Sequence, residues 1–261
     1  MHTYRTALLV SAALLVAACG EKPPVTDAAM QSEPAPATLR DKLANASRSA
    51  DDQARDAGRK PADVIEFLGI EPGMNVLDMM AAGGWYTEVL SIAVGPTGHV
   101  TAHNTPGALQ MRDGANEVAI SARLADNRLP NVSRLNKETT ELSADDGPFD
   151  AGLTALNLHD IYNRGGESAA VAALTAVFST LKPGAVFGVI DHEGSPENDN
   201  VALHRMLKAD AIRVAEAAGF VLEAESDVLH FDLDDMTQHI RADGLRGYTN
   251  RFVLRLRKPS L

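Results

Sequence analysis

The sequence predicts an α/β fold with a mostly parallel sheet, helices on both faces and an antiparallel hairpin at the C-terminal end. From about residue 60 onward, short apolar runs of strand length alternate with segments of helical periodicity. Such alternation is typical of parallel sheets with right-handed crossover connections. No helical pattern separates the last two apolar runs, which predicts the hairpin. The chain has 261 residues, 45% of them hydrophobic, so one domain of this kind can bury a full core.

In the first half of the domain, turn residues mark the ends of the elements. Pro61 opens a short helix and Gly69 ends it, as proline and glycine commonly do at helix termini. The predicted strands cover residues 74–78, 99–103 and 132–135, and the predicted helices cover 85–94 and 115–127.

In the second half, the apolar runs are longer. The predicted strands cover residues 149–156, 185–191, 220–229 and 250–257, and the predicted helices cover 167–181 and 200–218. The runs at 74–78, 149–156 and 185–191 are almost continuously apolar. We therefore expect these three to be neighbouring central strands, buried on both faces, with the last two strands antiparallel at one side.

Charge and cysteine content exclude several functions. The formal net charge is -11 and the isoelectric point is near 5.1. Such a surface repels nucleic-acid phosphates, so no nucleic-acid partner is expected. The single cysteine, Cys19, excludes an internal disulfide and a cysteine-based zinc site.

The N-terminus has the pattern of a bacterial lipoprotein signal. A positive start and an apolar run from 7 to 18 end in Val16-Ala17-Ala18-Cys19, which resembles the lipobox. We expect residues 1–18 to be a signal peptide and Cys19 to be lipidated. Because Gly20 follows rather than Asp, the resemblance favours the outer membrane, facing the periplasm of the cell envelope. An ordinary secretory signal with a chance cysteine is the alternative.

Two polar segments separate this signal from the first strand. The proline-rich stretch at 19–38 predicts a flexible tether, which leaves 39–261 as the folded domain. Residues 39–59 favour helix but show little apolar face. The part from Arg48 to Arg59 covers the ligand pocket in one interpretation and is a solvated charged helix in the other.

The loop after the first strand is the predicted ligand site. In open parallel sheets, ligands bind beyond the carboxyl ends of the strands. Asp78 ends the strand, and the small residues Ala81, Ala82, Gly83 and Gly84 follow. Small residues let backbone N–H groups approach a ligand closely. The next two residues, Trp85 and Tyr86, are interpreted as core rather than as ligand-stacking rings.

Two His/Asp pairs are predicted to lie at the same edge of the sheet. His159 and Asp160 follow the fourth strand, and Asp191 and His192 end the fifth. A histidine can take a proton from a nucleophile while a carboxylate orients the ring, so these four residues are the predicted catalytic groups. The alternative is that the aspartates cap backbone groups and the histidines are surface polar residues. Spacing alone does not define a metal site here, and none is predicted.

The motifs that carry a family resemblance cover about four fifths of the chain. They are RKPADVIEFLGIEPGMNVLDMMAAGGWYTEVLS at 59–91, NLHD at 157–160, LKPGAVFGVIDH at 181–192, and AAGFVLEAESDVL followed by RFVLRLRKP at the end. In this order they resemble the class I S-adenosylmethionine-dependent methyltransferases, and within them a group of predicted exported bacterial proteins.

The resemblance implies a Rossmann-like class I methyltransferase fold, S-adenosylmethionine as cofactor and methyl transfer to a small-molecule acceptor. It assigns cofactor binding to the residues after the first two strands. These are Asp78, Met80, Ala81, Ala82, Gly83, Gly84 and Asn104. The sequence departs from the family pattern at three of them: Met80 and Ala82 stand where glycine is usual, and Asn104 stands where an acid usually holds the ribose.

These departures keep a second class of function open. S-adenosylmethionine is made in the cytoplasm, whereas the signal predicts export. A lipoprotein that reuses the fold to bind a ligand, without catalysis or with another activity, is therefore the alternative. A nicotinamide oxidoreductase is disfavoured, because that site also expects the missing acid.

Overall fold

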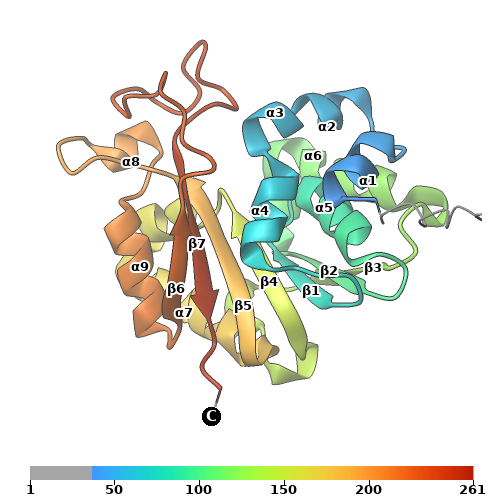
Figure 1. Cartoon of the computed structure of the whole chain (residues 1–261). Coiled ribbons are helices and arrows are strands. Elements are labelled where there is room, and N and C mark those ends of the chain that lie inside the picture. Colours follow the sequence, from blue (N-terminus) through green and yellow to red (C-terminus); the bar gives the residue numbers. More distant parts are fainter. Residues whose placement is uncertain (1–36, 261) are drawn as a thin grey trace, which may run out of the picture. The chain divides into compact units, whose positions relative to one another are not determined.

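The computed structural model describes residues 37–260, which form one seven-stranded sheet flanked by helices (Figure 1). The strand order is β3-β2-β1-β4-β5-β7-β6. The strands are β1 (Asn75–Met79), β2 (His99–Asn104), β3 (Val132–Asn136), β4 (Phe149–Ala155), β5 (Leu181–His192), β6 (Val221–Ser226) and β7 (Arg251–Arg257). The predicted signal peptide, Cys19 and most of the tether lie outside the described residues.

The sheet confirms the predicted arrangement. Strands β3 to β5 are parallel, whereas β7 runs antiparallel to both of its neighbours, β5 and β6. The central strands β1, β4 and β5 are neighbours, and their apolar side chains are buried. Because alternate residues of a strand face opposite sides, Val76 and Leu77 of β1 belong to two different cores.

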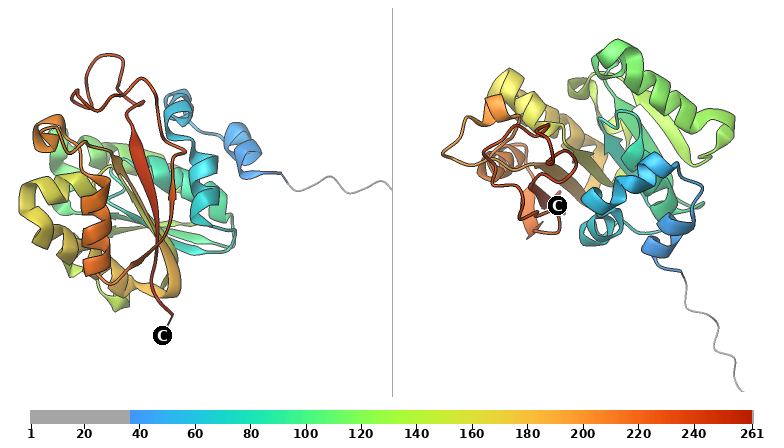
Figure 2. Two further views of the ribbon diagram at one scale, coloured as in Figure 1. Left: turned by 60° about the vertical axis from the view of Figure 1, so that its left-hand side comes forward. Right: turned by 90° about the horizontal axis from the view of Figure 1, so that it is seen from above.

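Helices cover both faces of the sheet (Figure 2). One core packs α7 and α9 against the sheet, and the other packs α1, α4 and α5. The helices are α1 (Leu39–Asn45), α2 (Ala50–Ala54), α3 (Asp56–Arg59), α4 (Pro61–Leu68), α5 (Trp85–Val94), α6 (Pro106–Leu124), α7 (Leu158–Thr180), α8 (Asn200–Leu203) and α9 (Lys208–Ala217). Short 3₁₀ turns lie at η1 (Ala125–Asn127), η2 (Thr139–Glu141) and η3 (Ala144–Asp146).

The predicted continuous helix over 200–218 is wrong. The chain leaves the helix at His204, which has a left-handed φ of 62°, and α9 begins only at Lys208. Between them Arg205 is fully buried against Asp234, and Met206 forms a bridge with Glu193 beyond β5. These tertiary contacts outweigh the helical periodicity of the segment.

Two helices begin earlier than the sequence predicts. Helix α7 starts at Leu158 and is interrupted at Gly166, whose φ is 73°, so His159 and Asp160 lie in its first turn. Helix α6 starts at Pro106 and is broken by left-handed backbone around Arg112. Within residues 37–260, no helix combines the length and apolar composition that a membrane span requires.

The long connection between β6 and β7 approaches the N-terminal helices. A Cβ built on Gly58 of α3 would lie 2.3 Å from the carbonyl oxygen of Gly247 in this connection, so the two backbones touch. The buried ion pair between Arg205 and Asp234 holds the connection, and its closest atoms are 2.8 Å apart. Segments from the two ends of the domain therefore meet above the carboxyl ends of β4 and β5.

Candidate active site

The loop after β1 keeps a backbone that favours glycine. Met80 has a φ of 56° and Ala82 a φ of 51°, both in the left-handed region, and Gly84 has a φ of 82°. A left-handed conformation costs a residue with a side chain roughly 1–2 kcal/mol. The two residues that replace the usual glycines thus adopt the same kind of backbone at a cost in stability.

Hydrogen bonds from β2 and β4 hold this loop in place. The N–H of Ala82 donates to Oδ1 of Asn104 at 2.8 Å, and Nδ2 of Asn104 donates to the Ala82 carbonyl at 3.2 Å. The N–H of Met80 lies 3.4 Å from Nδ1 of His103, and Nδ2 of Asn157 donates to the Met80 carbonyl at 3.2 Å. Asn104 lines the cavity beside the loop, but its amide is already occupied, so in this structure it positions the loop.

Asp78 lies at the base of the loop and is buried. Burial raises the pKa of its carboxyl to about 6, although a 2.6 Å hydrogen bond from the Thr87 hydroxyl and the charge of Arg59 oppose the shift. The carboxyl group can therefore be either protonated or ionised near neutral pH.

The loop lines a cavity that we name the β1 chamber, with a volume of about 880 Å³. The chamber is lined by Met80, Ala81, Ala82 and Gly83, whereas Gly84 does not line it. Other walls come from β2, from α6 and from the helices α2 and α3. Of the two interpretations of residues 48–59, cover of the pocket holds for Asp52, Arg55 and Arg59, which line the chamber.

Gly83 has a packing role that the sequence did not reveal. A Cβ on Gly83 would lie 2.8 Å from the Cβ of Ala119. The glycine thus allows α6 to approach the loop and form a wall of the chamber. Trp85 and Tyr86 are both at most 5% exposed, as predicted for core residues, yet both also line the chamber.

A second cavity adjoins the first, and we name it the histidine chamber. It has a volume of about 790 Å³ and is lined by His159, Asp160 and His192. Residues from α3, α6 and α7 line both chambers, which makes them neighbours. The two predicted His/Asp pairs therefore come together at one site.

His159 and Asp191 form a buried dyad. Nδ1 of His159 is 2.5 Å from Oδ1 of Asp191, and the backbone N–H of His159 donates to Oδ2 at 2.8 Å. Burial alone lowers the pKa of His159, but the charge and hydrogen bond of Asp191, with a smaller effect of Asp160, outweigh it and raise the pKa. Nε2 of His159 is buried and has no hydrogen-bond partner among the described residues.

His192 differs from His159 in charge. Burial, followed by the charges of His159 and nearby arginines, holds its pKa well below the usual value, so this ring is neutral. Its Nδ1 lies 2.8 Å from the hydroxyl of Thr249. The ring centres of the two histidines are 5.6 Å apart.

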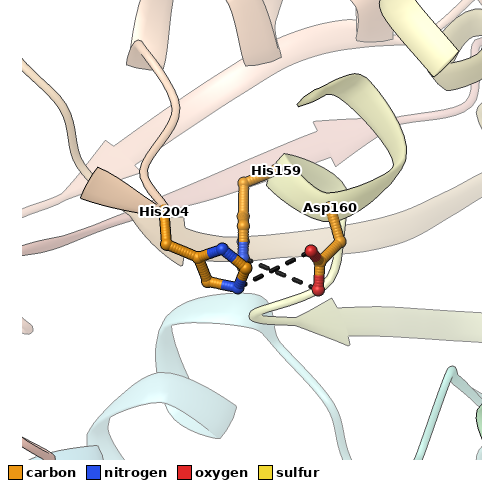
Figure 3. A group of neighbouring side chains, drawn as sticks. All are labelled: His159, Asp160 and His204. Carbon is orange, nitrogen blue, oxygen red and sulfur yellow. Dashed lines mark ion pairs between the residues drawn. The ribbon is translucent and has the colours of Figure 1, made fainter. Parts of the chain in front are cut away.

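His204 completes the cluster (Figure 3). Its Nε2 lies 3.6 Å from Oδ1 of Asp160, and Nε2 of His159 lies 3.8 Å from the other oxygen of that carboxylate. Three ligand-type atoms, one from each residue, lie within 4.8 Å of one another, so this is where the described part of the chain could hold a metal ion. No motif in the sequence marks His204, which falls inside the predicted helix over 200–218.

The arginines of the site were also missed. Arg59 and Arg251 line the histidine chamber, together with Arg241 and Arg246 of the β6–β7 connection. No motif marks these positions. Glu138 and Glu141 line neither chamber; together they cap η2.

Comparisons with known proteins agree with this architecture. No protein-family model matches the chain. The chain is 27% identical over 194 residues to the ubiquinone/menaquinone biosynthesis C-methyltransferase UbiE of Shewanella pealeana, covering 71% of this chain and 72% of the relative. It is similar to the solved structure of a SAM-dependent methyltransferase from Aquifex aeolicus, with a TM-score of 0.56, 20% identity, and coverage of 76% of this chain and 89% of the other.

A second solved structure was determined with ligands bound. It is the 1,6-didemethyltoxoflavin-N1-methyltransferase of Burkholderia thailandensis with 1,6-didemethyltoxoflavin and S-adenosylhomocysteine. It matches with a TM-score of 0.52, 19% identity and coverage of 80% of each chain. Sheet order, the closing antiparallel pair and the solved structures agree on a Rossmann-like class I methyltransferase fold, and the curated relative to which the chain is similar is a methyltransferase.

Proposed function

We propose that the domain binds S-adenosylmethionine in the β1 chamber and transfers its methyl group to a small molecule in the histidine chamber. The observation that carries the proposal is the pair of adjoining chambers at the carboxyl edge of the sheet. One is walled by the loop after β1, and the other contains the His159–Asp191 dyad.

The residues of the β1 chamber fit this cofactor. Its volume lies in the range typical of pockets for small ligands. Trp85 and Tyr86 offer apolar ring surface, Arg55 offers positive charge for a carboxylate, and Asp78 offers a negative charge. When bound, the cofactor supplies a methyl group on a positively charged sulfur, which is open to attack by a nucleophile.

In the histidine chamber, His159 is the proposed base. Because Nδ1 donates to Asp191, the lone pair of the neutral ring is on Nε2, the atom without a partner. That atom can accept a proton from an acceptor hydroxyl or amine as the nucleophile attacks. Asp191 orients the ring and stabilises the charge that it gains, so it acts as a positioning residue.

Calorimetry of the full chain with S-adenosylhomocysteine tests cofactor binding. We expect binding by the wild type and loss of binding by Gly83→Val, since a branched side chain would push Ala119 and α6 out of place. Gly95→Val is the matched control: its Cβ would meet no atom within 4 Å, and it lines neither chamber. The left-handed φ of Gly95 makes a thermal melt necessary alongside. A folded wild type that gives no heat with S-adenosylhomocysteine or with S-adenosylmethionine would overturn the cofactor assignment.

We also propose that Cys19 carries a lipid that attaches the protein to the outer membrane. The support is the Val16-Ala17-Ala18-Cys19 pattern, because acyl chains bury about 0.8 kcal/mol per CH₂ group in the bilayer. Cys19→Ala should move the protein from the membrane pellet to the soluble fraction. Unchanged attachment would contradict the proposal.

A ligand-binding lipoprotein without turnover is the second candidate. It is favoured by the loop itself, because Met80 and Ala82 place side chains in the chamber where the family usually has none. This candidate predicts cofactor or analogue binding with no methyl transfer in any variant. Met80→Gly and Ala82→Gly, assayed for affinity and turnover together, separate the two candidates.

A further inference from the structure

The histidine chamber is positively charged in a negatively charged protein. The chain has 35 acidic residues against 24 lysines and arginines. Seven arginines and a single carboxylate, Asp160, line this chamber. That carboxylate is already paired, since an Nη atom of Arg164 lies 3.1 Å from it. The local charge is thus opposite to that of the whole molecule.

Elsewhere in the described chain, buried and half-buried arginines have carboxylate partners. Arg205 pairs with Asp234 at 2.8 Å, Arg48 pairs with Asp56 at 2.6 Å, and Arg123 pairs with Asp52 at 2.8 Å. Pairing of this kind is expected, because an unpaired charge removed from water is costly. Buried arginines without such partners therefore need an explanation.

Buried Arg251 and half-buried Arg59 are such exceptions, and both line the histidine chamber. The side chain of Arg59 has no hydrogen bond or ion pair within residues 37–260, and its guanidinium lies 4.6 Å from the ring centre of Trp85. Burial and the neighbouring charge of Arg55 lower its pKa to about 10, which leaves it charged at neutral pH. Arg251 is 4% exposed and donates only to the carbonyls of Thr249 and Gly247.

The cofactor's own carboxylate does not account for this charge. Arg59 lines both chambers and could contact the cofactor, but Arg241, Arg246 and Arg251 line the histidine chamber alone. Arg241 and Arg246 are exposed residues of the β6–β7 connection. A guanidinium forms paired hydrogen bonds with carboxylate and phosphate oxygens.

We propose that the methyl acceptor is a small anion, bearing a carboxylate or phosphate group that Arg59 and Arg251 bind beside His159. The inference rests on the proposed function and adds the chemical class of the acceptor. The volume of about 790 Å³ suits a small molecule rather than a polymer. In the bound state the anion supplies the anionic partner that Arg59 and Arg251 lack.

The test is calorimetry on the full chain saturated with S-adenosylhomocysteine, at constant ionic strength. Inorganic pyrophosphate probes the phosphate class, and citrate probes the carboxylate class. We expect one of them to bind and Arg59→Met to weaken its binding about tenfold or more, as loss of a charged hydrogen bond would. Arg246→Gln, an exposed substitution, should weaken it in the same direction if Arg59→Met does not fold.

Arg213→Gln is the control, because Arg213 is an exposed arginine outside both chambers. Failure of both anions to bind, or equal weakening by Arg213→Gln, overturns the proposal. The two levels of inference fail separately. Adenosyl binding without anion binding refutes only the acceptor class. Anion binding that Arg59→Met abolishes, in a protein that binds no adenosyl compound, supports the anion site and refutes the cofactor assignment.

Discussion

The two chambers are built in opposite ways. The β1 chamber is built around one continuous segment, the loop after β1, and hydrogen bonds to Asn104, His103 and Asn157 hold that loop. The histidine chamber is assembled from residues as far apart as Arg59 and Arg251. One of its buried polar atoms, Nε2 of His159, has no hydrogen-bond partner among the described residues.

This difference separates a preformed binding loop from the groups that are expected to take part in the reaction. A satisfied loop is rigid before the ligand arrives, which suits a site that must present a reactive group at a fixed place. Unsatisfied buried groups cost folding stability, and they are retained where a ligand or a transition state completes them. The histidine chamber is therefore where we expect substitutions to affect turnover most.

The largest expected effect is on turnover by His159→Ala. Loss of a general base typically lowers the rate by about 10²–10⁴-fold, whereas affinity for S-adenosylhomocysteine in the β1 chamber should stay within about twofold of the wild type. In the wild type, the rate should rise with pH through a pKa above the usual value for histidine, because Asp191 and Asp160 together outweigh burial. Methyl-transfer assays across pH measure both effects.

His230→Ala is the control, since this histidine is exposed and pairs only with Asp232. Equal loss in both variants would contradict the assignment of the base. Activity lost on dialysis against a chelator and restored by a divalent cation would instead make His159, Asp160 and His204 metal ligands.

The next effect concerns the β6–β7 connection, which lines the histidine chamber. Asp234→Ala leaves Arg205 buried without its carboxylate, which typically costs about 3–5 kcal/mol. Because the pair fixes the β6–β7 connection, ligand affinity in the histidine chamber should fall more than affinity for S-adenosylhomocysteine. Denaturant unfolding and calorimetry measure the two quantities. Equal losses of affinity in both chambers would show that they are not separately built.

A smaller effect concerns Asp78, the exception within the β1 chamber. Its folded pKa of about 6 is above the ordinary value of 3.8, so the folded state favours the protonated form. The stability that this carboxyl contributes is present below pH 4 and is lost as pH rises through about 6. Asp78→Asn should remove this dependence and stabilise the domain at pH 8 by roughly 1–3 kcal/mol. Unfolding curves at several pH values test it, and an unchanged pH dependence would contradict it.

The smallest expected effect is a gain in stability from Ala82→Gly. The left-handed φ of 51° favours glycine, so the free energy of unfolding should increase by about 1 kcal/mol. Ala81→Gly is the matched control, because Ala81 is not among the residues with positive φ and should not be stabilised. A loss of stability in Ala82→Gly would mean that its methyl packs usefully in the loop.

The sequence was most informative where the residues of a site follow one another along the chain. The loop at Asp78–Gly84 and the central strands could be predicted, because a strand, a turn of small residues and a helix leave a local pattern of hydrophobicity and glycine. The two His/Asp pairs could be predicted to share an edge, because parallel strands end on the same side. Arg59, His204 and Arg251 carry no local pattern, so their role could not be predicted.

The sequence by itself determined the strand order's central part, the antiparallel close of the sheet and the position of the loop after β1. Only the tertiary structure decided where the helix over 200–218 breaks, because burial of Arg205 against Asp234 outweighs local helical preference. Only the tertiary structure turned Asn104 toward the loop and brought α3 against Gly247. Local patterns arise from neighbours along the chain. The charge and the unpaired hydrogen-bonding groups of the histidine chamber arise from residues that become neighbours only on folding.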